Sequence, residues 1–117
     1  MTEKEKAKYY YLNGLAYYAN GTSNIEDCAV AIENLEKAVT INPQYEKAYI
    51  LLGVILSDNS NYQRAINNFN NAININKKNY KTYWRLAETY NRFEEYSEAK
   101  KSAKQSLKIN HLLNFQA

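Results

Sequence analysis

The sequence predicts an all-α solenoid built from three antiparallel helix pairs, and three observations lead to this fold class. Apolar residues recur at steps of three and four along most of the chain, as they do on one face of an α-helix. The pattern repeats with a period of 34 residues, so that Tyr49 aligns with Tyr83 and Ala65 with Ala99. Glycine and proline are scarce, at three and one of 117 residues, which disfavours a turn-rich β fold.

The segment 61–79 is the least obvious helix of the chain, because its asparagine content alone suggests a disordered or β-prone tract. Its apolar residues nevertheless follow helical spacing from Tyr62 to Ile73, and asparagines fill the opposite face. Asparagine is a weak helix former, so this helix needs neighbours that pack on its apolar stripe. The other copies of the repeat provide them, since units of a repeat array bury their apolar faces against one another.

Local signals place the individual helices. Thr2 with Glu5, Ser23 with Glu26, and Ser60 with Gln63 each fit a capping box, in which two side chains satisfy free N–H groups at a helix start. Asn42-Pro43 ends one helix and opens the next, because proline suits only the first turn of a helix. The predicted helices span residues 3–20, 24–41, 44–57, 61–75, 79–92 and 95–109, followed by a short C-terminal tail.

The repeated residues resemble the tetratricopeptide repeat (TPR) family, whose pattern runs Trp-x-x-Leu-Gly-x-x-Tyr and then Ala, aromatic and Ala. The middle unit matches at Tyr49, Leu52, Gly53, Leu56, Ala65, Phe69 and Ala72; the third at Tyr83, Leu86, Ala87, Tyr90, Ala99, Ala103 and Ser106; and the first at Tyr10, Gly14, Tyr17, Ala31, Leu35, Ala38 and Pro43. The resemblance implies one TPR domain over 1–117, a right-handed superhelix with repeats at about 7–45, 46–79 and 80–113 and an apolar tail at 111–117.

The sequence departs from the family pattern at two places. About five extra residues lie between Gly21 and Ala31; we interpret them as a surface insertion that lengthens the second helix, with a partner contact as the alternative. At the C-terminus the extra solvating helix common in TPR arrays is missing. The apolar tail is therefore expected either to fold over the last repeat or to dock on another copy of the chain, through Leu112, Leu113 and Phe115.

Composition and motifs argue against several functional classes. The net charge of +3 is mild and its charges are interleaved, which argues against a nucleic-acid partner. No apolar run reaches the length of a membrane span, no signal peptide is evident, and the single Cys28 indicates a reducing, cytoplasmic location. The only histidine, His111, lies in the tail, and neither metal-ligand spacing nor a phosphate loop occurs. We therefore expect no enzyme activity, no metal and no cofactor.

The resemblance implies that the first helix of each unit lines a concave groove that holds a peptide or helix of a partner protein. By alignment, this groove presents Tyr11, Ile50 and Trp84 at equivalent positions, with Leu15, Val54 and Glu88 one turn further along and Leu12, Leu51 and Arg85 beside them. Large apolar groups such as Ile50 and Trp84 need a reason to face outward, because Tyr49 and Tyr83 already take the packing position. The competing interpretation is ordinary core packing.

Lys8, Lys47 and Lys81 also occupy equivalent positions and predict a positive row along the groove, which favours an acidic partner. Their alternative role is that of solvated surface lysines. Lys81 and Arg85 match two residues of the carboxylate clamp found in chaperone-binding TPR domains. Tyr11, Leu15 and Leu51 replace the remaining clamp residues, so a clamp-type co-chaperone is a minor alternative.

Together these features predict a non-catalytic protein–protein interaction module or adaptor, which captures a peptide or helix in its concave groove. The expected partner carries apolar and acidic residues, with no nucleic acid or membrane involved. The main alternative is a structural module that forms homo-oligomers through its uncapped C-terminal end.

Overall fold

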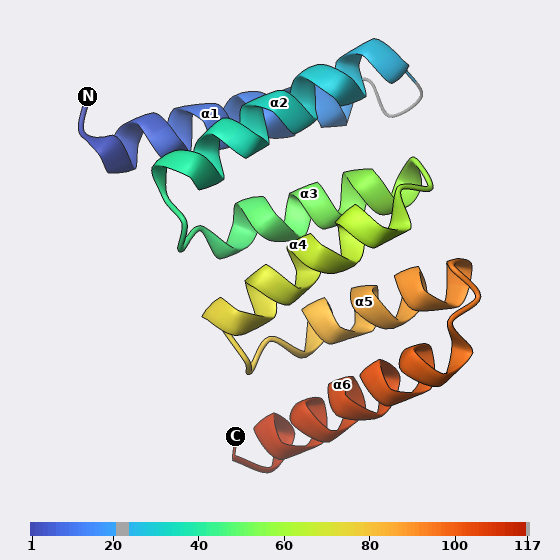
Figure 1. Ribbon diagram of the computed structural model, residues 1–117. Helices are drawn as coiled ribbons and strands as arrows, with labels where there is room; N and C mark the ends of the chain where they lie inside the picture. The colour runs from blue at the N-terminus through green and yellow to red at the C-terminus, as the bar shows by residue number, and fades with distance from the viewer. Residues whose placement is uncertain (21–23, 117) are drawn as a thin grey trace.

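The computed structural model contains three helix pairs stacked one after another, with the two chain termini at opposite ends of the stack (Figure 1). It describes residues 1–20 and 24–116, without the side chains of Asn20, Phe115 and Gln116. Over these residues every element is helical, so the predicted all-α fold class is confirmed. The helices are α1 (Glu3–Asn20), α2 (Ile25–Ile41), α3 (Glu46–Asp58), α4 (Tyr62–Ile75), α5 (Tyr80–Arg92) and α6 (Tyr96–Gln116).

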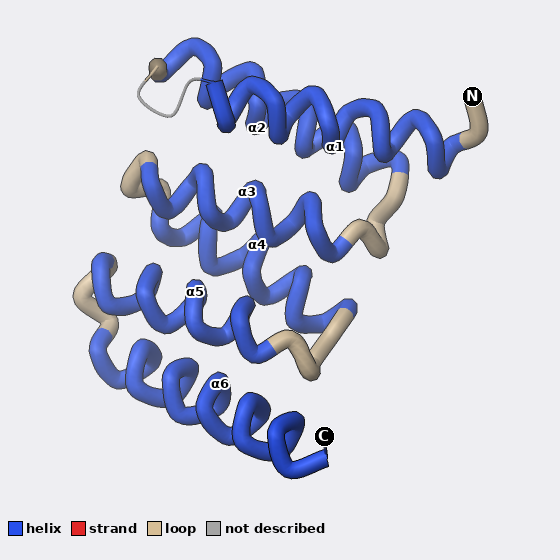
Figure 2. The backbone as a smooth tube through the Cα atoms, turned by 180° about the vertical axis from the view of Figure 1, so that it is seen from behind, coloured by secondary structure: helices blue, strands red, loops and turns tan. Residues whose placement is uncertain are grey.

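Each helix packs against the next one in sequence, and the first helices of successive pairs also touch, α1 with α3 and α3 with α5. Seen from behind, the turns within the second and third pairs lie on one side of the stack and the links between pairs on the other (Figure 2). This arrangement follows from the sequence period, because equivalent positions of adjacent units are placed side by side.

Small residues let the two helices of a pair approach closely. A Cβ atom added to Gly53 would lie 2.6 Å from the ring of Phe69, and one added to Gly14 would lie 2.7 Å from Leu35 Cγ. In the third pair Ala87 takes the place of Gly53, and the aromatic position opposite it is Ala103. In the third pair the first helix thus has a larger residue at this crossing than in the second pair, and the second helix has a smaller one.

The core runs through the first, second and third pairs as one cluster of buried side chains. Its largest fully buried members are Leu35, Leu52, Ile55, Leu56 and Phe69. They come from the apolar stripes identified by helical spacing, including the stripe of the asparagine-rich α4, where Ala65, Ile66 and Phe69 are buried. The asparagines of α4 remain at the surface, which explains why this composition is compatible with a stable helix.

The capping boxes have different outcomes. The box at the start of α1 is confirmed: the Glu5 N–H donates to Thr2 Oγ1 and the Thr2 N–H to Glu5 Oε1, both at 3.1 Å. The predicted box of Ser23 and Glu26 involves a residue outside the described part of the chain. The side chain that caps α2 is Asn24, whose Oδ1 accepts from the Glu26 N–H at 2.9 Å.

The predicted box of Ser60 and Gln63 is wrong. Ser60 has a φ of 64°, in the left-handed region, and therefore closes α3 instead of opening α4. Its N–H donates to the Ser57 carbonyl and the next N–H, of Asn61, donates to the Leu56 carbonyl, which is the Schellman arrangement of a helix C-terminus. Glu94, the equivalent residue of the third pair, has a φ of 62°.

The ends of two helices also differ from a regular repeat. α2 begins six residues before Ala31, whereas α4 begins three residues before Ala65, so the insertion does lengthen the start of the second helix. The expectation of a tail after residue 109 is wrong, because α6 continues to Gln116. Leu112 and Leu113 are 50% and 38% exposed on this continuation and do not fold over the last pair. No glycine or proline after Ile109 interrupts the helix.

Candidate functional site

An open concavity of about 440 Å³ lies where the first helices of the three pairs come together. We call it the central groove. It contains six of the ten groove residues expected from the sequence, contributed by α1, α3 and α5, and two further polar side chains. Its lining residues are Tyr11, Tyr18, Lys47, Ile50, Leu51, Val54, Asp58 and Arg85.

The middle of the central groove is apolar. Ile50, Leu51 and Val54 project from α3, and each is half-buried against the core. Tyr11 of α1 adds an aromatic wall, which is held in place by the ring of Tyr45 at a centroid distance of 5.1 Å. Burial raises the pKa of Tyr45 above its ordinary value, with the neighbouring Tyr11 as a second cause. The groove thus offers apolar surface on a rigid helical base.

One end of the central groove is polar and ties the three pairs together. The Tyr18 hydroxyl donates to Asp58 Oδ2 at 2.8 Å, and Arg92 Nη1 of α5 lies 3.4 Å from Asp58 Oδ1. Burial and then the hydrogen bond to Asp58 raise the pKa of Tyr18 to about 12. Tyr18 is therefore a neutral donor at physiological pH, and the Asp58 carboxylate is shared between α1 and α5.

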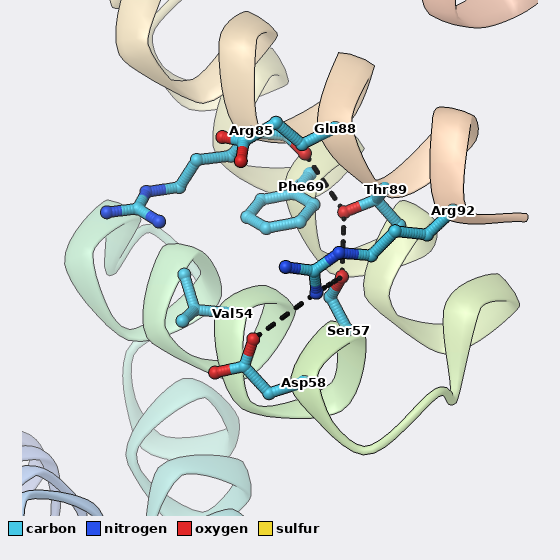
Figure 3. A pocket seen from close by; sticks show the side chains of 8 residues that line it. All are labelled: Val54, Ser57, Asp58, Phe69, Arg85, Glu88, Thr89 and Arg92. Carbon is cyan, nitrogen blue, oxygen red and sulfur yellow. Dashed lines mark hydrogen bonds and ion pairs between the residues drawn. The ribbon is translucent and has the colours of Figure 1, made fainter.

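A second, smaller pocket of about 30 Å³ adjoins this end and is filled by a hydrogen-bond network (Figure 3). The Thr89 hydroxyl lies 3.0 Å from Ser57 Oγ and 2.9 Å from the Arg85 carbonyl, and Arg92 Nη1 donates to Ser57 Oγ at 3.4 Å. In Figure 3 the Arg85 guanidinium points away from this network. The pocket holds room for little more than water, so its role is to join α3 to α5.

The charges around the central groove are mainly positive. Lys47 and Arg85 line it, and the only acidic lining residue, Asp58, is engaged by Tyr18 and Arg92. Lys81 lies beyond Arg85, and Lys8 is exposed on α1. Of the three lysines expected to form a row along the groove, Lys47 therefore lies inside it, whereas Lys8 and Lys81 lie outside it.

Trp84 does not line the central groove with the other expected anchors. It is 49% exposed and stands between two separate concavities on the outer side of the last helix pair. One of these, of about 390 Å³, also contains Lys81, Arg85 and Leu107; the other, of about 370 Å³, contains Tyr96 and Lys100. Leu15 is 38% exposed on α1. Arg85 is the residue shared between the central groove and the outer side.

Tyr18 and Asp58 were missed by the sequence analysis, although one signal could have identified the second. Asp58 and Arg92 are separated by the repeat period of 34 residues and carry opposite charges. Equivalent positions of adjacent first helices lie side by side, so opposite charges there predict an ion pair between repeats. The hydrogen bond from Tyr18 has no comparable signal, because the position equivalent to Tyr18 in the second unit is Ser57, one residue before Asp58.

No group of three or more His, Cys, Asp or Glu side chains is close enough to hold a metal ion in the described part of the chain. Over the same residues, no helix combines the length and the apolar character that crossing a membrane requires. The single cysteine, Cys28, is buried in α2.

The fold and the groove define a helical-repeat protein whose stacked pairs form a concave surface. The family model for the tetratricopeptide repeat matches residues 46–79 and 80–110, which is more than half of the chain. The protein therefore belongs to the tetratricopeptide repeat family, whose members are generally non-catalytic protein–protein interaction modules. The two matched segments are the second and third helix pairs.

Solved structures share the fold at low sequence identity. MamA superposes with a TM-score of 0.85 at 24% identity, over 95% of this chain and 62% of that one. The TPR2B domain of yeast Sti1 in complex with pHsp70 gives 0.83 at 19% identity, over 97% and 86% of the two chains. The Arabidopsis OM64 TPR domain gives 0.82 at 20% identity, over 92% and 85%.

The chain spans 62% and 56% of the lengths of two MamA chains that it matches, so it corresponds to part of them. A search of curated protein sequences found no match. At these identities the structural likeness concerns the fold alone.

Proposed function

We propose that the protein is an adaptor that captures a peptide or helix of a partner protein in the central groove. The observation that carries this proposal is the apolar patch of Ile50, Leu51, Val54 and Tyr11, which is open to solvent beside the polar end at Tyr18 and Asp58. Apolar surface in a preformed concavity is the usual site for a partner's anchoring side chains. A non-catalytic interaction module is the function typical of the family.

The charge of the groove gives the partner a second property. Lys47 and Arg85 flank the apolar patch, while Asp58 is already engaged by neighbours of its own chain. A partner segment with an apolar anchor and a carboxylate within one or two helical turns of it would pair with both features. Complementary charge at the edge of the site mainly accelerates encounter and selects partners.

A homo-oligomeric function would use a different part of the surface, at the two ends of the stack. A clamp for a C-terminal carboxylate receives less support, because Tyr11, Leu15 and Leu51 stand where the clamp has a lysine and two asparagines. Lys81 and Arg85, which do match, lie together on the outer side of α5.

The test is selection of binding peptides from a random displayed library on the folded chain, followed by measurement of the affinities of the selected peptides for variants. The groove variants are Val54→Asp, which puts a charge into the apolar patch, and the pair Lys47→Glu with Arg85→Glu. The matched control is Lys104→Glu with Lys108→Glu on α6, which makes the same change in net charge away from the groove.

We expect Val54→Asp to weaken binding at least tenfold and the groove charge reversal to favour peptides without carboxylates. The control variant should bind like the native chain, and circular dichroism should show equal helix content in all variants. Selected peptides that bind the groove variants and the native chain equally would overturn the proposal. Loss of binding in the Lys104 and Lys108 control alone would place the site on α6.

A further inference from the structure

The outer face of α1 has no partner within the chain. In α3 and α5 the equivalent face is covered by the preceding pair, so that Ala48 and Ile55 are fully buried and Thr82 and Thr89 nearly so. The residues of α1 at these positions are Tyr9, which is 51% exposed, and Ala16, which is exposed. Leu12, beside them, is 49% exposed. Terminal repeats normally carry a polar outer face, and α1 does not.

The opposite end of the stack is uncovered as well. Ile66 and Ile73 are buried, at 4% and 9% exposure, on α4, a helix that packs against both α3 and α5. Their equivalents on α6 are Lys100 and Leu107, and Leu107 is 61% exposed. Trp84 and Tyr96 complete this outer face of α5 and α6. The exposed face of α1 and the exposed face of α5 and α6 are therefore equivalent to the two surfaces that successive pairs bury against each other inside the chain.

We infer that the α5–α6 end of one copy binds the α1 end of a second copy, head to tail. The internal interface supplies the register, because Thr89 of α5 lies against Ser57 of α3 at 3.0 Å. In the contact between two copies, Ala16 of the second copy is equivalent to Thr89, and Asn91 of the first copy is equivalent to Ser57. Two turns earlier on both helices, the same register brings Tyr9 of the second copy against Trp84 of the first. The first helix of the second copy thus takes the place of a fourth repeat.

Side-chain size and charge fit this pairing better than the pairing of two identical ends. The α6 side is less bulky than its internal counterpart, with Ala103 in place of Phe69. The α1 side is bulkier at the position opposite Trp84, with Tyr9 in place of Ala48 or Thr82, and smaller at the other, with Ala16 in place of Ile55 or Thr89. The α5–α6 end carries Lys81, Arg85 and Lys100 against a single Glu88, and two such ends would repel each other.

The contact lies away from the apolar residues that the sequence suggested for oligomerisation. By helical spacing, the uncovered stripe of α6 runs from Tyr96 through Ala103 and Leu107 to His111. Leu112 and Leu113 lie off this stripe, and the side chain of Phe115 is outside the described part of the chain. A head-to-tail contact is also open-ended, because each added copy presents a new free end. The central groove is not covered by it, so this inference is independent of the proposed function.

The experiment uses sedimentation velocity on the full chain over a wide concentration range, together with the emission of its single tryptophan. The α1-end variant is Tyr9→Glu with Leu12→Glu, and the α6-end variant is Lys100→Glu with Leu107→Glu, which keeps Trp84. A control, Leu112→Ser with Leu113→Ser, removes apolar surface beside the stripe. All substituted positions are half-exposed or exposed, and circular dichroism checks that each variant remains helical.

For the native chain and the control, the mass should rise with concentration from 13.6 kDa to beyond two chains, and the Trp84 emission should move to shorter wavelength. Each end variant alone should keep the mass of one chain at every concentration. An equimolar mixture of the two should form a dimer that grows no further, because one intact α1 end meets one intact α6 end.

Three results would overturn the inference. The native chain could keep the mass of a single chain throughout. The α1-end variant could still associate by itself, which would indicate pairing of identical ends. The mixture of the two end variants could fail to form a dimer, which would show that the two faces do not bind each other.

Discussion

The hydroxyl of Tyr18 donates a hydrogen bond of 2.8 Å to Asp58, joining α1 to α3 across 40 residues of sequence. The same carboxylate pairs with Arg92 of α5, so one side chain connects all three helix pairs. These contacts lie at the polar end of the central groove. They fix how the first helices sit relative to one another, and hence the width of the groove between them.

Replacing Tyr18 by Phe should lower the free energy of unfolding by about 1 kcal/mol, the usual value of a hydrogen bond to a partly exposed charged acceptor. The ring and its packing are kept, so only the link to Asp58 is removed. Chemical denaturation measures the change. An Asp58→Asn variant that loses no more than Tyr18→Phe would show that the ion pair with Arg92 adds little, as expected for an exposed pair.

The same link predicts a dependence on pH. The pKa of Tyr18 is raised to about 12 by burial and by the bond to Asp58, from an ordinary value near 10. Since the folded chain holds this proton more tightly, the stabilisation is complete below pH ~10 and is lost as the pH rises towards ~12. The difference in unfolding free energy between the native chain and Tyr18→Phe should therefore shrink over this interval. A constant difference would contradict the shift.

Thr82 offers a stabilising substitution. Its Oγ1 is buried and has no hydrogen-bond partner, whereas the buried hydroxyl of Thr89, two turns later on α5, bonds to the Arg85 carbonyl. Valine has the same shape without the hydroxyl. We expect Thr82→Val to raise the free energy of unfolding by about 1 kcal/mol and Thr89→Val to lower it by about the same amount. Denaturation of both variants tests this, and equal effects would contradict it.

Gly53→Ala should destabilise the second helix pair. Alanine gains up to about 1 kcal/mol over glycine within a helix. Its Cβ would, however, lie 2.6 Å from the ring of Phe69, which is 1% exposed and cannot move aside. Overpacking of this kind costs about 1–3 kcal/mol, so we expect a net loss of stability. In a Phe69→Ala background, which imitates the third pair, Gly53→Ala should instead be neutral or favourable. Additive effects would argue against a direct clash.

Ser60 is a second place for a stabilising change. Its φ of 64° is costly for a residue with a Cβ atom and free for glycine. Ser60→Gly should therefore raise the melting temperature, by an amount equivalent to roughly 0.5–1 kcal/mol. Asn59, whose φ is −92°, provides the control, because glycine there gains nothing in the folded state. A similar gain at both positions would contradict the conformational explanation.

The order and pairing of the helices could be predicted from the sequence because they depend on local and repeated patterns. Helical spacing located the start of every helix to within a few residues, even in the asparagine-rich α4, although it ended α6 seven residues too early. The period of 34 residues then indicated which faces meet, since each unit can bury its stripe only against its neighbours. The apolar middle of the central groove followed from the same alignment.

The geometry of the turns and the contacts between pairs required the tertiary structure. Ser60 looks like a helix start in sequence, but the chain direction after α3 puts it in the left-handed region that ends that helix. Trp84 aligns with Ile50 and was expected in the same groove. It stands instead on the outer side of α5 and α6, between two concavities of the last helix pair.

A three-pair helical array of the tetratricopeptide repeat family, with an apolar stripe along its first helices, could be predicted from the order of the residues. The meeting of Tyr18, Asp58 and Arg92, and the exposure of Tyr9 and Leu107 at the two ends, became evident from the folded chain. The periodicity of a sequence shows which face of each helix is apolar. The side chains that meet between two adjacent pairs depend, in addition, on how far one pair is shifted along the next.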